Sequence, residues 1–211
     1  MASMDTGAAG LVRRLAAADG AAAHPFHATL IARAAAPRDL GDAVHALCAV
    51  HGHHPDLFEI VAGDPAAGPR DWLEAAVAGF AAERLFLANL VAAAGPLPST
   101  PGQAQSETAL TAERHALEML ARSERTGVGL GAAAALVWDW TALRQLLAHA
   151  ADRFGIDVPP STLPDLAATA AALDSCPAAE RAVAFGAQQL FAQHRGLLSL
   201  LEARASARGH D

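Results

Sequence analysis

The hydrophobic positions along the chain recur with the period of an α-helix, and Pro and Gly divide them into separate segments. Almost none of these segments has the alternating, β-branched pattern that is typical of strands. We therefore predict an all-α protein. Four long helices are expected at 70–94, 104–125, 128–155 and 177–205, after shorter helices at 9–19, 25–36, 40–52 and 55–63.

The connections between the long helices predict how these helices are arranged. The turns at 95–102 and around Gly127 are short, and short connections place consecutive helices side by side and antiparallel. The segment 157–176 is Pro-rich and has room for at most one short helix. We therefore predict one domain over 1–211, in which 70–205 form an up-down-up-down four-helix bundle and the short helices of 1–63 pack on one side.

Composition excludes several classes of function. The net charge is −7, and a protein that binds nucleic acid phosphates needs clustered cations, so we expect no nucleic acid partner. All fifteen cationic side chains are Arg, and Tyr is absent as well. The chain therefore has no Schiff-base lysine, no P-loop lysine and no tyrosine general acid.

The sequence also indicates where the protein resides. Its apolar stretches are interrupted by charged residues or Gly well before the roughly 20 residues that a membrane span needs, and the N-terminus makes a poor secretory signal. Cys48 and Cys176 belong to no metal-binding or redox motif. We expect a cytoplasmic protein with no membrane partner.

Each predicted long helix carries one ionisable residue on or near its apolar stripe, namely Glu83, Glu113, Asp139 and His194. Counted from the turns at about 1.5 Å per residue, the four residues lie at similar heights along the bundle. They are therefore predicted to share one buried layer. Unpaired charges are costly to bury, so the four side chains need groups that neutralise or hydrogen-bond them.

Three explanations of the layer are open. In the first, Glu83 pairs with Arg114 and Glu113 pairs with Arg84 across the hairpin, and the layer is structural. In the second, all four residues of the layer are ligands of Fe or Mn, because such metals are bound by carboxylates and imidazoles inside helical bundles. In the third, the layer lines a metal-free polar pocket for a small ligand.

Histidines and tryptophans add two further candidates. His51 and His54 would share one helical face and suit a metal or haem if their helix continued, but Gly52 and Pro55 favour a helix end at which imidazoles meet the helix dipole. Trp138 and Trp140 flank Asp139, and the 100° helical turn per residue directs Trp140 into the core. These tryptophans are either large core residues in an Ala-rich bundle or walls of a ligand pocket.

The segment 96–140, with PLPSTPGQAQSETALTAERHALEML followed by GLGAAAALVWDW, resembles a group of uncharacterised helical proteins from high-GC bacteria. This resemblance implies a shared fold and no assigned activity. The layer also resembles ferritin-like carboxylate proteins in architecture, although His115-Ala-Leu-Glu118 reverses their Glu-x-x-His order. The opening His24-Pro25-Phe26-His27 is similar to the first helix of TenA-type, haem-oxygenase-like bundles.

Our first functional hypothesis is a non-enzymatic binding or interaction protein with an internal layer of ion pairs. The first alternative is a ferritin-like or haem-oxygenase-like metal-binding oxidoreductase that uses Glu83, Glu113, Asp139 and His194. The second alternative is a carrier of a small apolar ligand held between Ala-rich helices. Ala-rich helix faces also suit the contacts of a homo-oligomer.

Overall fold

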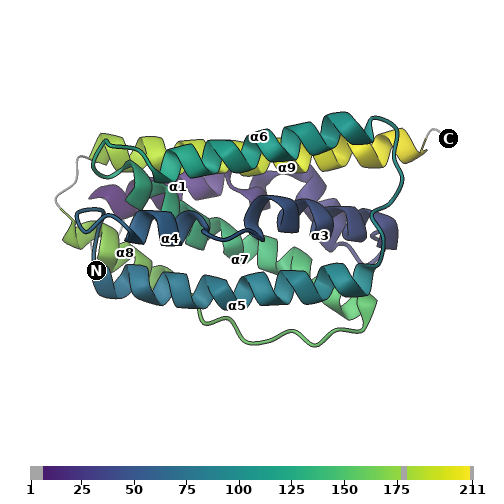
Figure 1. Ribbon diagram of the computed structural model, residues 1–211, viewed down its shortest axis with the longest axis horizontal. Coiled ribbons are helices and arrows are strands. Elements are labelled where there is room, and N and C mark those ends of the chain that lie inside the picture. The colour runs from purple at the N-terminus through teal and green to yellow at the C-terminus, as the bar shows by residue number, and fades with distance from the viewer. Residues whose placement is uncertain (1–6, 177–179, 210–211) are drawn as a thin grey trace.

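The computed structural model of the protein describes residues 7–176 and 180–209 (Figure 1). Within these ranges the chain forms nine α-helices, one short 3-10 helix and no β-strand, which confirms the predicted all-α fold. The elements in chain order are α1 (Gly7–Asp19), η1 (Ala21–Ala23), α2 (Pro25–Ile31), α3 (Pro37–His51), α4 (Leu57–Ala62), α5 (Arg70–Ala94), α6 (Gln103–Ala121), α7 (Val128–Phe154), α8 (Leu166–Ser175) and α9 (Glu180–Gly209).

Local sequence signals set several of the helix ends. Pro25 and Pro37 lie in the first turns of α2 and α3, where the missing N–H has no helical partner to lose. A capping box begins α4, because the Asp56 side chain accepts from the Glu59 N–H while the Glu59 side chain accepts from the Asp56 N–H. Gly155 ends α7 in the left-handed conformation, with a φ of 70°.

The predicted helices match these elements, with differences at several of their ends. The helix predicted at 104–125 ends at Ala121. The prediction that Pro37 stops the helix at 25–36 is wrong, since α2 ends at Ile31 and Pro37 begins α3. The last helix extends to Gly209, and its predicted first residues, 177–179, lie outside the described residues. The one short helix expected in the Pro-rich segment is α8.

Helix α7 is the central element of the fold. Every residue from Gly127 to Trp140 is buried, and α7 contacts each of the other described helices. A helix that is apolar on all sides has no solvent face and must be enclosed. Because this stretch consists mainly of Gly, Ala, Leu and Val, neighbouring helices pack closely against it on every side.

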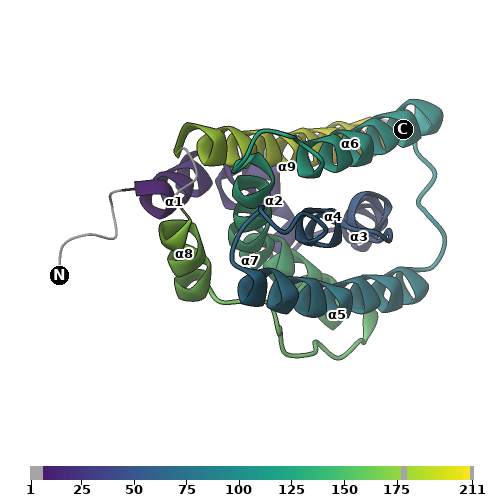
Figure 2. The same cartoon turned by 60° about the vertical axis from the view of Figure 1, so that its left-hand side comes forward.

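Helices α3 and α4 lie between α5 and α6, which differs from the predicted arrangement. Both α3 and α4 contact α5 on one side and α6 on the other. Figures 1 and 2 show the same order, with α6 above, α3 and α4 in the middle, and α5 below. The link at 95–102 therefore joins two helices that are not packed directly on each other, and the helices of 1–63 contribute to the core.

Helices α7 and α9 run in the same direction, because the segment 156–165 carries the chain back along the outside of the molecule (Figure 1). The expected up-down-up-down order is therefore not followed here. The two helices cross closely at Gly131 and Gly186. A Cβ on Gly131 would clash with the backbone of Val183, and one on Gly186 would clash with the Val128 carbonyl.

A buried ion-pair network connects α3 to α9 near the C-terminal end of α9. Asp42 accepts from Arg204 Nε at 2.8 Å and from Arg208 Nη1 at 2.7 Å. Asp39 accepts from Arg208 Nη2 at 2.8 Å, and Thr100 accepts from Arg208 Nη1 at 2.8 Å. Two guanidinium groups are thus balanced by two carboxylates in the interior.

Among the described helices, α5 alone is long and apolar enough to cross a membrane by length and composition. Helices that form the core of a globular fold meet the same criterion. In this structure α5 buries Glu83 together with apolar residues that include Phe80, Leu87 and Leu90.

The close crossing of α7 and α9 predicts opposite effects for two glycines of the same helix. Gly186→Ala is expected to destabilise the fold by about 2 kcal/mol or more, because the new methyl group meets the α7 backbone, which cannot move aside. Gly196→Ala is the control, since nothing lies within 4 Å of its added methyl group, and it should stabilise α9 by roughly 0.5–1 kcal/mol. Urea unfolding measures both. Equal effects of the two substitutions would contradict the close crossing.

Candidate functional site

A chain of three hydrogen-bonded side chains crosses the core between α3, α7 and α9. Asp139 lies in the middle of α7, and its Oδ2 is 2.6 Å from His194 Nδ1 on α9. Its Oδ1 accepts from the backbone N–H of Ala21, in η1, at 2.6 Å. His194 Nε2 is 3.1 Å from Nε2 of His51, the last residue of α3. We call Asp139, His194 and His51 the relay.

The bond partners assign the protons of the relay when both imidazoles are neutral. A carboxylate only accepts, so His194 Nδ1 carries the proton that faces Asp139. His194 Nε2 is then an acceptor, and the proton between the rings belongs to His51 Nε2. His51 Nδ1 is left with a lone pair and has no partner among the described residues.

Aromatic side chains surround the inner part of the relay. The His51 ring makes edge contacts with Trp140 at 5.4 Å and with Phe80 at 6.1 Å between centroids, and Phe80 lies 4.8 Å from Trp140. Burial, together with the neighbouring His194, holds the pKa of His51 well below 6.5. His51 is therefore a neutral base at neutral pH.

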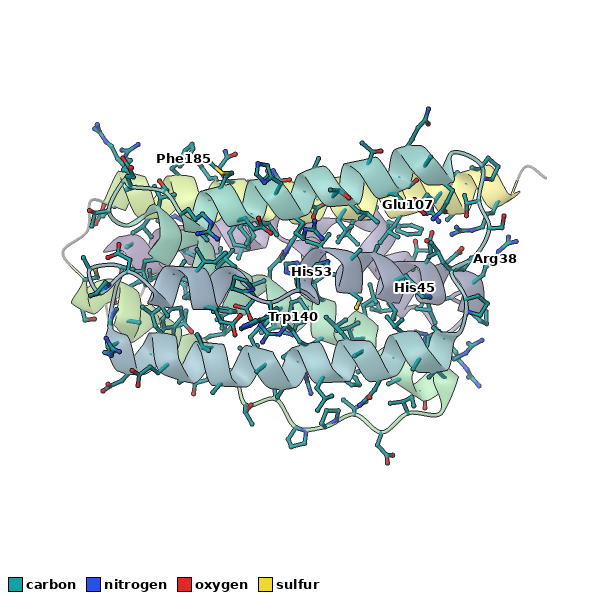
Figure 3. All side chains as sticks on the ribbon, viewed as in Figure 1. Arg38, His45, His53, Glu107, Trp140 and Phe185 are labelled. Atoms are coloured by element: carbon teal, nitrogen blue, oxygen red, sulfur yellow. The ribbon has the colours of Figure 1, made fainter. Side chains whose placement is uncertain are left out.

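The outer side of His51 lines a small opening between α3, the α3–α4 link and α6. Its volume is about 20 Å³, which is room for one water-sized group. Arg114 of α6 and His53 of the link lie at this opening, 2.8 Å apart between Nη1 and Nε2. Figure 3 shows His53 on the link and Trp140 further toward α5.

Glu113 of α6 is a second buried acid in this region. Its side chain is only 8% exposed, and its Oε1 has no hydrogen-bond partner among the described residues. Burial raises the pKa of Glu113 to about 7, and the nearby His194 acts in the opposite direction. The carboxyl group is thus close to half-protonated at neutral pH.

Glu83 is buried as predicted but takes part in a different cluster. It forms an ion pair with Arg144 of α7 and accepts from Ser161 Oγ at 2.9 Å. Arg144 also donates to the Pro159 carbonyl. Glu83 and Arg144 therefore hold the segment 156–165 against the helices.

The predicted reciprocal pairs Glu83 with Arg114 and Glu113 with Arg84 are wrong. Arg84 pairs instead with Asp56 and Glu59, at the start of α4, and Arg114 lies next to His53 and Glu118. The reason is the position of α3 and α4, which separate α5 from α6 and supply the partners that were assigned across the hairpin.

The described residues do not assemble the predicted Fe or Mn site. Within 7–176 and 180–209, no group of three or more His, Cys, Asp or Glu side chains is placed to hold a metal ion. Asp139 and His194 do meet, but their polar atoms bond to each other, to the Ala21 N–H and to His51, and Glu83 is neutralised by Arg144. The proposed four-ligand set is therefore not formed.

The secondary His cluster is divided by the end of α3. His51 ends the helix on its core side, whereas His54 lies in the link, exposed, and bonds to Glu59 Oε2 at 2.8 Å. Of the two tryptophans, Trp140 is in the core and its Nε1 has no partner among the described residues. Trp138 lines a cavity of about 340 Å³ between α1, α7 and α8.

Two features were missed by sequence reasoning. His51 was assigned to a separate His cluster, although its spacing from Leu40, Val44 and Leu47 places it on the buried face of α3. The network of Asp42, Arg204 and Arg208 was also missed, although the spacing of four residues between the two arginines placed both on one face of α9.

Comparison with known proteins gives one match. A family model described as a family of unknown function, DUF6975, matches residues 16–209. No curated protein and no solved structure matches the chain. The likeness to ferritin-like and haem-oxygenase-like bundles and the high-GC bacterial origin stay predictions.

The raised pKa of Glu113 predicts that the free energy of unfolding depends on pH. A carboxyl group whose pKa is raised on folding makes the free energy of unfolding fall as the pH rises from about 4.5 to about 7, and the penalty is complete above 7. Glu113→Gln should therefore stabilise the protein by about 3 kcal/mol at pH 9 and have little effect at pH 4. Denaturant unfolding at both pH values measures this. Glu74→Gln, on the exposed face of α5, is the control and should have little effect at either pH.

The proton positions assigned to the relay predict the effect of replacing Asp139. In Asp139→Asn the side-chain oxygen still accepts from the Ala21 N–H, so the NH₂ faces His194 Nδ1, which must then accept. The His194 proton moves to Nε2, and the charge-assisted bond to the carboxylate is lost. We expect a loss of about 2–4 kcal/mol in unfolding free energy. Nitrogen-15 NMR of the imidazoles should show the change of tautomer at His194. An unchanged tautomer would contradict the assigned proton positions.

Proposed function

The chain belongs to the family of unknown function DUF6975, and we propose that it is an acid–base enzyme in which His51 is the general base. The observation that carries this proposal is the unpartnered Nδ1 of His51, at the outer end of a relay whose inner end is a buried carboxylate. Glu83 is neutralised by Arg144, whereas the relay ends at an opening to the surface, so the relay is the part of the layer suited to chemistry.

The relay lets His51 accept a proton without leaving a charge on its own buried ring. When Nδ1 takes up a proton, His51 can pass its Nε2 proton to His194 Nε2 along the existing 3.1 Å contact. The positive charge then resides on His194, whose Nδ1–H donates to the Asp139 carboxylate at 2.6 Å. The Asp139 carboxylate stabilises this imidazolium, which offsets the low proton affinity that burial gives His51.

The size of the opening indicates which group loses the proton. A volume of about 20 Å³ admits one water molecule and excludes an organic substrate, whose body must stay at the mouth near Arg114. We therefore propose hydrolysis of a small ester. A water O–H bond breaks as its proton goes to His51 Nδ1, the water oxygen bonds to the ester carbonyl carbon, and the carbonyl oxygen takes the electron pair. The carbonyl then re-forms as the bond between this carbon and the alkoxy oxygen breaks, and His51 Nδ1 returns the proton to the leaving alcohol.

Arg114 is suited to stabilise the negative charge that develops on the carbonyl oxygen. It lines the same opening as His51, its side chain is one-third exposed, and its ion-pair contact with Glu118 is a long 3.8 Å. A cation fixed beside a developing oxyanion lowers the barrier to its formation. His53 bonds to Arg114 and holds it at the mouth.

A matched pair of histidines tests the proposal. His51→Gln removes the base, whereas His54→Gln makes the same change three residues away at an exposed side chain. With 4-nitrophenyl acetate as the probe, we expect the wild type and His54→Gln to accelerate hydrolysis equally and His51→Gln to lose roughly 100-fold or more. Circular dichroism confirms that each variant is folded.

Protonation of the relay removes the base, so the rate of hydrolysis is expected to fall as the pH is lowered. A wild-type rate equal to that of folded His51→Gln would contradict the proposal and support a purely structural relay. Nitrogen-15 NMR that places the His51 proton on Nδ1 would contradict it as well.

A further inference from the structure

A second cavity, distinct from the opening at His51, lies between α3, α6 and α9. Its volume is about 190 Å³. Its walls are mostly apolar, formed by Ala and Leu side chains, and its polar lining includes His45, Glu107 and Arg204. In Figure 3, His45 on α3 and Glu107 on α6 lie on the two sides of this region. An apolar cavity with a few fixed polar groups is the usual form of a small-molecule site.

The cationic group at this cavity is already neutralised. Arg204 donates from Nε to both oxygens of Asp42, at 2.8 and 3.0 Å, and from Nη2 to Gln103 Oε1 at 3.0 Å. Arg204 is 5% exposed, so its guanidinium and the Asp42 carboxylate form a buried pair. An anionic ligand would therefore meet Asp42 and Glu107 without an uncompensated cation to bind it.

Three polar groups at the cavity have unused capacity. The Glu107 carboxylate and His45 Nδ1 are acceptors, and Arg204 Nη1 is a buried donor without a partner, on a guanidinium whose charge Asp42 already balances. Glu107 accepts from Gln103 Nε2 at 2.8 Å and has no cationic partner among the described residues. His45 Nε2 is 2.9 Å from the Gly95 carbonyl, which can only accept, so the proton of the neutral ring is on Nε2 and Nδ1 offers a lone pair. No described residue bonds to that Nδ1.

We propose that this cavity binds a primary alkylammonium ion. The three N–H donors of the ammonium group match the Glu107 carboxylate and His45 Nδ1, and the alkyl chain would contact the apolar walls. Charge complementarity selects this class over a carboxylate or a neutral alcohol of the same length. The site is independent of the relay, since it shares no lining residue with the opening at His51.

Three probes of equal chain length test the ligand class. Isothermal titration of the full chain with n-hexylammonium, 1-hexanol and hexanoate compares a cation, a neutral molecule and an anion. We expect saturable binding of hexylammonium, roughly tenfold weaker binding of hexanol and no binding of hexanoate. Failure of hexylammonium to bind at about 10 mM, or binding of hexanoate at equal affinity, would overturn the proposal.

Two variants with matched controls locate the site. Glu107→Gln should weaken hexylammonium binding roughly tenfold, whereas Glu202→Gln, the same change of charge on the exposed face of α9, should leave it unchanged. Ala49→Leu narrows the cavity and should abolish binding, while Ala82→Leu on the exposed face of α5 should not. Binding that is insensitive to both Glu107→Gln and Ala49→Leu would place the amine elsewhere and overturn the assignment. Thermal unfolding confirms that each variant is folded.

Discussion

The structure depends on one constraint, which is the burial of the Asp139 carboxylate in the central helix. An isolated carboxylate in the core would cost several kcal/mol, so its two oxygens require donors that are held in place. Oδ1 receives the Ala21 N–H, and Oδ2 receives His194. These contacts fix η1 and α9 against α7 at Asp139, and His51 brings α3 to the same point.

The sequence predicts the secondary structure well, because the signals that set it are local. Periodic apolar residues, prolines in first turns and glycines at helix ends gave all of the long helices within a few residues. The burial of Glu83, Glu113, Asp139 and His194 also followed from helical periodicity alone. That part of the prediction required only knowing which face of each helix is apolar.

The partners of the buried groups could not be predicted in the same way. A short link usually places two consecutive helices side by side, but the link at 95–102 spans the width of α3 and α4, which lie between α5 and α6. Glu83 then faces Arg144, which sequence reasoning did not consider, and Arg84 meets Asp56 and Glu59. Which helices are adjacent is a property of the whole core, and no local pattern encodes it.

The relay also has a consequence for the order in which the chain can acquire its fold. The relay and its contact with Ala21 join distant parts of the sequence, since 118 residues separate Ala21 from Asp139 and 143 separate His51 from His194. During synthesis α7 emerges with its carboxylate before α9 exists, so the early chain has a charged, incompletely enclosed central helix. The interior can therefore close only after α9 has been synthesised, so the folding of the earlier helices is coupled to a segment much later in the chain.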